Sequence, residues 1–134
     1  MSWERVHTVN DFYDGPRMGV ADFQGTPHIY QAEFSEAEDD YTGRFWLKRI
    51  EQDLFSLIME GWAIWLRWQA AFREGKTTLE THPALPEERK RHRELIEAIG
   101  DRFHARPEHS VLKVGHFRCA SSGDLQVEWT DPHQ

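Results

Sequence analysis

The sequence of 134 residues contains a single cysteine, Cys119, so no disulfide can form within the chain. A lone thiol is typical of proteins from a reducing compartment. The longest strongly apolar stretch, residues 54–72, is interrupted by charged and polar side chains, whereas a membrane-spanning helix needs about 20 mostly apolar residues. The first residues, MSWERVHTV, lack the pattern of a secretory signal. We therefore expect a soluble, cytoplasmic protein that makes no membrane contact.

Motifs that would specify a chemical reaction are also missing. The eight histidines form no H-x-x-x-H pair, and C-x-x-C does not occur. The closest pairings, His104 with His109 and His116 with Cys119, lack the second pair that a zinc site requires. The string GKTT at residues 75–78 lacks the upstream glycine of a phosphate-binding loop. We expect no metal and no cofactor, and the absence of these motifs disfavours an enzyme without excluding one.

The charge balance disfavours nucleic acid as a partner. The formal net charge of −7 repels a phosphate backbone unless basic residues gather on one face. One basic run, residues 88–93, contains Arg89, Lys90, Arg91 and Arg93. It begins a predicted helix and is followed by further acidic residues, so a solvated helix surface of mixed sign is the simpler interpretation. Nucleic-acid binding through this run is the least favoured function.

The size and composition predict a single domain over residues 1–134, with 39% hydrophobic and 29% charged residues of both signs. Residues 5–49 are typical of strands joined by tight turns. Gln24-Gly25 lies between two such runs, which predicts a hairpin with a two-residue loop. This register pairs Gly19 with Tyr30, Ala21 with His28 and Phe23 with Thr26, and places all six residues on one face.

The pattern changes near residue 51 and predicts a helix over residues 51–74, ended by Gly75. Its polar residues recur every seven positions and form one narrow stripe: Asp53, Glu60, Arg67 and Glu74. The rest of its circumference is largely apolar, so several sides must be covered. The sheet, a second helix and a partner subunit are the available covers.

A second helix is predicted over residues 86–105, because Pro86 suits the first helical position and Pro107 follows. Residues 111–130 predict a second hairpin turning at residues 121–123. The order of strands, two helices and strands indicates an α+β fold. We expect an antiparallel sheet or small, partly closed barrel built from both hairpins, with the two helices inserted and packed against it.

One polar cluster is a candidate site: Asp11, Asp14, Arg17, His28 and Tyr30. If the fold gathers these side chains at a sheet rim, they provide acid–base and anion-binding groups. The simpler alternative is a local ion pair in which Arg17 reaches Asp14 or Asp11 and buttresses a turn.

Six tryptophans are unusual in a chain of this size. Trp62, Trp65 and Trp68 lie three residues apart on the first predicted helix and span a broad face. They form either the principal core or a surface that binds a partner or ligand.

The strings FYDGPRMGVADFQGTPHIYQAEF, WAIWLRWQAAF and THPALP resemble a group of small bacterial proteins to which no activity is attached. The resemblance implies a stand-alone, cytoplasmic bacterial domain and nothing more. The leading hypothesis is a non-enzymatic domain that acts through protein contacts, as a homodimer or with another protein. The alternative is a small-molecule-binding protein or enzyme whose pocket lies between sheet and helices and is lined by the polar cluster.

Overall fold

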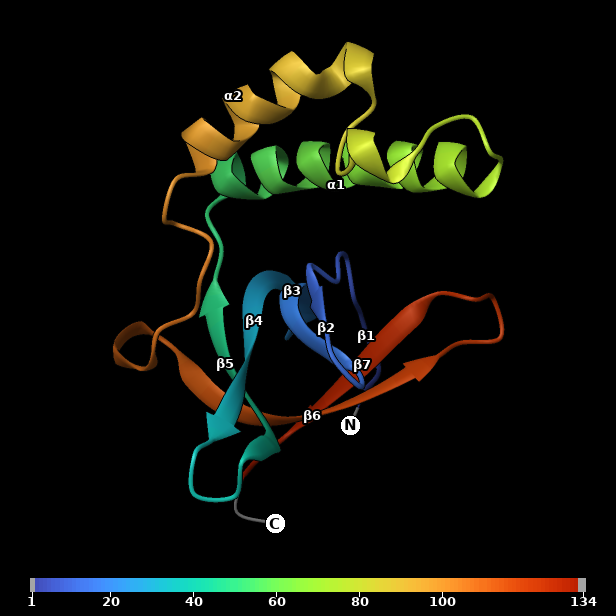
Figure 1. The fold of residues 1–134 in the computed structure, drawn as a ribbon. Helices are drawn as coiled ribbons and strands as arrows, with labels where there is room; N and C mark the ends of the chain where they lie inside the picture. Colours follow the sequence, from blue (N-terminus) through green and yellow to red (C-terminus); the bar gives the residue numbers. More distant parts are fainter. Residues whose placement is uncertain (1, 133–134) are drawn as a thin grey trace. The chain divides into compact units, whose positions relative to one another are not determined.

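The computed structural model describes residues 2–132 and has an α+β fold, as the sequence predicted (Figure 1). The chain divides into two compact units. The sheet unit comprises the chain up to Ile50 and from His104 onward, and the helical unit comprises Glu51–Phe103. The two helices are thus inserted between the two hairpin regions.

Within residues 2–132 the sheet unit forms one curled, antiparallel sheet in the order β1-β7-β6-β5-β4-β3-β2. β5 pairs with β6, so the N-terminal and C-terminal hairpins join in a single sheet, as expected. The strands are β1 (Glu4–Arg5), β2 (Asp11–Phe12), β3 (Pro16–Phe23), β4 (Thr26–Ser35), β5 (Asp40–Arg49), β6 (Val111–Cys119) and β7 (Leu125–Thr130).

The predicted register of the first hairpin is confirmed. Gly19 lies opposite Tyr30, Ala21 opposite His28 and Phe23 opposite Thr26. Gly19 is required for close packing, because a Cβ atom there would lie 2.7 Å from the Tyr30 hydroxyl oxygen. The large phenol therefore lies over a residue without a side chain, which is why these two residue types face each other.

The N-terminal segment partly closes the sheet. The Val6 amide donates to the Leu125 carbonyl of β7 at 3.2 Å. The next residues bond β3 instead, with the His7 and Thr8 amides donating to the Val20 carbonyl at 2.8 and 3.1 Å. Because one segment bonds strands far apart in the sheet order, the sheet curls on itself, and the prediction of a small, partly closed barrel is confirmed.

Aromatic side chains fill the interior of the curled sheet. The rings of Tyr30, Phe45, Phe117 and Trp129 lie within 6.3 Å of one another, mostly in tilted or edge-to-face arrangements. The buried residues of this cluster are Ala21, Tyr30, Phe45, Leu47 and Val127. Gly115 provides the space, because a Cβ atom there would lie 2.7 Å from the Trp129 ring.

The helical unit consists of α1 (Gln52–Arg73) and α2 (Arg89–Ile99) with short 3₁₀ turns at Leu79–Thr81 and Pro86–Glu88. Ile64, Ala84 and Leu95 form its buried core. Three of the four residues of the polar stripe make ion pairs with the second half of the helical unit: Asp53 with Arg102 at 3.0 Å, Glu60 with Arg91 at 2.6 Å and Arg67 with Glu88 at 2.9 Å. The stripe therefore marks the side of α1 that faces the second half of this unit.

The helix ends follow the glycines. α1 ends as predicted, because Gly75 has a positive φ and the Gly75 and Lys76 amides donate to the Phe72 and Ala71 carbonyls. The predicted end of the second helix at residue 105 is wrong by six residues. Gly100, with φ of 56°, stops α2.

Ala105 is buried in the sheet unit, where its amide donates to the Gln31 side-chain oxygen at 2.9 Å.

None of the helices within residues 2–132 combines the length and apolar character needed to cross a bilayer.

Candidate functional site

The structure gives Arg17 a different partner from the one the sequence suggested. Its guanidinium donates to the main-chain carbonyls of Tyr13 at 2.7 Å and Asp14 at 3.2 Å. It also lies over the ring of Tyr41, 4.1 Å from the ring centroid. Both candidate carboxylates, Asp11 and Asp14, are exposed. Arg17 therefore buttresses the turn through carbonyl groups, and the carboxylates point to solvent.

The other two members of the predicted cluster serve the fold. His28 Nδ1 lies 2.7 Å from the Thr26 carbonyl, and its ring meets Phe23 edge-on. The Tyr30 hydroxyl donates to the Thr8 carbonyl at 2.8 Å in the interior. Burial raises the pKa of Tyr30 far above its usual range, so the phenol stays a neutral donor.

Within residues 2–132, no hydrogen bond or ion pair joins any two side chains of the predicted five-residue cluster. Arg17 touches the backbone of the turn that contains Asp14, but His28 and Tyr30 bond other groups. The structure thus does not assemble an acid–base constellation from these residues.

Arg17 instead belongs to a group of exposed and partly exposed residues, here called the aromatic patch: Tyr13, Phe34, Tyr41 and Arg17. Phe34 and Tyr41 are paired across β4 and β5, with ring centroids 5.2 Å apart and nearly perpendicular. Tyr13, in the turn between β2 and β3, lies 6.3 Å from Tyr41. Tyr13 is 69% exposed and Phe34 is 47% exposed. Large apolar side chains that contact one another at the surface indicate a binding surface more than isolated ones do.

Carboxylates adjoin the residues of the aromatic patch in the sequence. The connection between Phe34 and Tyr41 is acidic, and Tyr13 lies between two further aspartates. We call these six exposed residues the acidic rim: Asp11, Asp14, Glu36, Glu38, Asp39 and Asp40. Among the residues the structure describes, none of them takes part in an ion pair. The rim therefore presents unneutralised negative charge beside exposed rings.

The three tryptophans of α1 have different environments. Trp68 is buried in the helical unit, where its indole N–H donates to Thr81 Oγ1 at 2.8 Å and its ring stacks on Phe72. Trp62 and Trp65 stack on each other with centroids 5.1 Å apart and remain partly exposed. Trp68 thus has a structural place, and an interface role for Trp62 and Trp65 remains a prediction.

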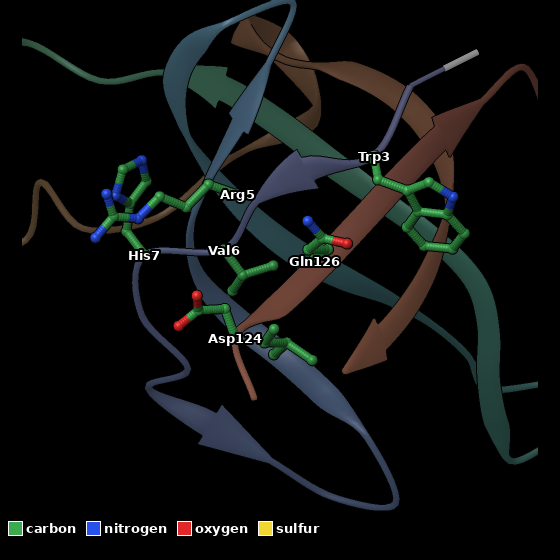
Figure 2. A pocket seen from close by; sticks show the side chains of 7 residues that line it. Trp3, Arg5, Val6, His7, Asp124 and Gln126 are labelled. Carbon is green, nitrogen blue, oxygen red and sulfur yellow. The ribbon is translucent and has the colours of Figure 1, made fainter. Parts of the chain in front are cut away.

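A cavity of about 620 Å³ lies in the sheet unit beside the N-terminal strand, and none of the predicted cluster residues lines it. Figure 2 shows Val6 and Gln126 near its centre, with Arg5 and His7 on one side and Trp3 on the other. His7 Nε2 lies 2.8 Å from Asp22 Oδ1, so the imidazole is held by a carboxylate. The lining residues are Trp3, Arg5, Val6, His7, Asp124, Leu125 and Gln126.

Metal-binding groups do not gather in the part of the chain that the structure describes, where no three His, Cys, Asp or Glu side chains are arranged to hold an ion. Cys119 is an exposed free thiol at the end of β6.

Comparisons with protein-family models, with curated proteins and with solved structures each give no match. The resemblance to small bacterial proteins therefore stays a prediction. Sequence reasoning missed the aromatic patch, although a signal was present: Tyr13 and Tyr41 adjoin turn residues and acidic residues, where aromatic side chains are not needed for a core.

Proposed function

We propose that this protein is a non-enzymatic domain that acts through contacts with protein. The observation that carries the proposal is the aromatic patch, in which the exposed rings of Tyr13 and Phe34 and the guanidinium of Arg17 each contact the ring of Tyr41. Tyrosine, phenylalanine and arginine are enriched in protein interfaces, and such residues dominate binding energy when they cluster.

The patch is also held in shape before any partner arrives. Arg17 is fixed by two carbonyl groups and lies against Tyr41, which in turn contacts Phe34 and Tyr13. Rigid aromatic side chains lose little conformational entropy on binding, because each has only two side-chain torsions. Preorganisation of this kind supports an interface more than a chance exposure of apolar area.

The groups that could have served an acid–base site support the same proposal, because they are engaged in the fold. His28 bonds a carbonyl within its own hairpin, and the neutral Tyr30 hydroxyl bonds Thr8. For the same protein we propose a cytoplasmic location, since the exposed thiol of Cys119 suits a reducing compartment.

A photo-crosslinking amino acid at position 34 tests the proposal. Leu79 is the matched control position, because it is apolar and 68% exposed but lies in the helical unit. In cells, the label at position 34 is expected to capture one defined protein that the label at position 79 does not. Equal labelling of the same proteins at both positions would contradict the proposal.

The captured protein then allows a direct affinity measurement. Tyr13→Ala is expected to weaken its binding at least about fivefold, the loss that corresponds to about 1 kcal/mol for an interface anchor. Leu79→Ala removes a similarly exposed side chain and is expected to leave the affinity unchanged. An unchanged affinity for Tyr13→Ala would refute the assignment of the patch.

The cavity supports a second candidate function, the binding of a small polar molecule. Its volume lies in the range of ligand pockets, and Arg5, Asp124 and Gln126 offer hydrogen-bonding groups. A screen of small polar molecules that follows tryptophan fluorescence tests this candidate. The candidate is supported by a ligand that changes the fluorescence of the wild type but not that of Trp3→Phe, and that does not bind Arg5→Ala. A screen that finds no such ligand would contradict this second function.

A further inference from the structure

The basic run of the sequence forms an exposed helix face in the structure. On α2, Arg89, Arg93 and Ile96 lie at positions i, i+4 and i+7, which places them on one side of the helix. Both arginines are exposed, and the apolar side chain of Ile96 is 55% exposed. With the neighbouring Lys90, we call these four residues the basic face.

The charges of the basic face are not used inside the described chain. Arg91, on another side of α2, is held by Glu60 and Glu94. In contrast, Arg89, Lys90 and Arg93 make no ion pair within residues 2–132. The same chain therefore carries three cations on α2 and six carboxylates on the acidic rim that make no ion pair within residues 2–132, and one exposed carboxylate, Glu97, lies beside the cations on α2.

We propose that the basic face of one copy of this chain binds the aromatic patch and acidic rim of a second copy. This inference rests on the proposed function and names the partner. Charge complementarity carries it: three unpaired cations meet six unpaired carboxylates, and such charges guide association and fix orientation. Ile96 adds an apolar group of the kind that exposed rings can cover.

The aromatic patch is suited to guanidinium groups in particular. Arg17 already lies over Tyr41 at 4.1 Å, so the surface accepts an arginine against a ring. Phe34 and Tyr13 offer further ring faces to the arginines of the incoming helix, and cation–π contacts strengthen as water is excluded. The two surfaces differ, so each copy contributes one of each kind to the assembly.

Sedimentation velocity on the purified full-length chain, over a range of concentrations, tests this inference. The wild-type protein is expected to associate as its concentration rises, more strongly at about 50 mM than at about 500 mM salt, because salt screens exposed charges. A monomer at every concentration would overturn the inference.

Two charge-reversed variants identify the surfaces. The rim variant is Glu36→Lys/Glu38→Lys, and the helix variant is Arg89→Glu/Arg93→Glu. Each alone is expected to associate at least about tenfold more weakly than the wild type, because the rim variant loses most of the rim's negative charge and the helix variant turns the helix face negative. An equal mixture is expected to recover association, since the unaltered helix face of the rim variant meets the unaltered rim of the helix variant.

Glu80→Lys/Glu108→Lys is the matched control, because it changes the net charge as the rim variant does at exposed residues outside the rim. It is expected to associate like the wild type or more strongly. Association that neither the rim variant nor the helix variant weakens would overturn the inference.

The failure of this inference differs from a failure of the proposed function. If the wild type stays monomeric while the label at position 34 captures another protein, the self-association is wrong and the interaction domain stands. If that label captures nothing beyond its control, the proposed function itself fails.

Discussion

The substitution Gly19→Ala tests how the N-terminal segment closes the sheet. A Cβ atom at position 19 would lie 2.3 Å from the Thr8 carbonyl oxygen and 2.7 Å from the Tyr30 hydroxyl oxygen. The first distance is about 1 Å shorter than an ordinary contact. Thr8 cannot easily retreat, because its amide and hydroxyl both bond Val20 in β3.

The expected loss of stability follows from these contacts. Forcing a methyl group into a packed site costs about 1–3 kcal/mol, and loosening the hydrogen bond from Tyr30 to Thr8 adds about 1 kcal/mol. We therefore expect Gly19→Ala to lower the free energy of unfolding by about 3 kcal/mol. With a urea dependence of about 1–3 kcal/mol per molar, the unfolding midpoint falls by about 1–3 M.

Urea unfolding followed by circular dichroism measures this shift. Gly61→Ala is the control, because the same methyl group there would lie 4.0 Å from Leu95 Cδ1 in the helical unit. That variant is expected to gain about 0.5–1 kcal/mol, since glycine is unfavourable within a helix. A loss below about 1 kcal/mol for Gly19→Ala would refute the close contact on which the closure depends.

Three further predictions concern the helical unit. Trp68→Phe removes the donor to Thr81 and is expected to cost about 1–2 kcal/mol in urea unfolding, so an unchanged midpoint would contradict the buried indole contact. Gly75→Ala is expected to cost about 1 kcal/mol in the same assay, because φ is +74° there, and a stabilised variant would contradict this helix end. Arg91 holds the pKa of Glu60 below its usual range. The ion pair therefore stabilises the fold at pH values above the pKa of Glu60 in the unfolded chain, and this stabilisation is lost as the pH falls through the pKa of Glu60 in the folded chain. Thermal melts of Glu60→Gln are therefore expected to depend less on pH below about 5 than those of the wild type, and identical pH profiles would contradict the ion pair.

The parts of the fold that depend on local pattern could be predicted from the sequence. The two-residue turn at Gln24-Gly25 fixes the register of the first hairpin, because glycine at the turn and small residues opposite large ones leave one arrangement without clashes. The period of α1 and its glycine stop are also local features. The polar stripe that contains Glu60 lies on the side of α1 that forms ion pairs, although the sequence did not identify Arg91 as the partner of Glu60.

Features that depend on distant parts of the chain could not be predicted. The end of α2 was placed too late, because Gly100 stops the helix before Pro107 and Ala105 bonds Gln31, which is 74 residues earlier in the chain. The hydrogen-bond partners of Arg17 could not be predicted either, because every residue has a main-chain carbonyl and the sequence does not show which one accepts the bond.

The aromatic patch could not be predicted because it too depends on distant parts of the chain. Phe34 and Tyr41 lie opposite each other only because β4 and β5 pair beyond the irregularity between Ala32 and Phe34. Tyr13 reaches them from a different turn. Residue spacing predicts which face of a strand a side chain takes, but it does not predict which ends of the sheet remain uncovered.

The central claim is that the aromatic patch is a protein interface. Hydroxyl-radical footprinting tests it most directly, with the protein associated either with partners in a cell extract or with itself at high concentration. Free chain is expected to be oxidised readily at Tyr13, Phe34 and Leu79, all of which are exposed. In the associated state the account predicts a several-fold loss of oxidation at Tyr13 and Phe34, with Leu79 unchanged. Tyr13 and Phe34 that stay as reactive as in the free chain would contradict an interface at the aromatic patch.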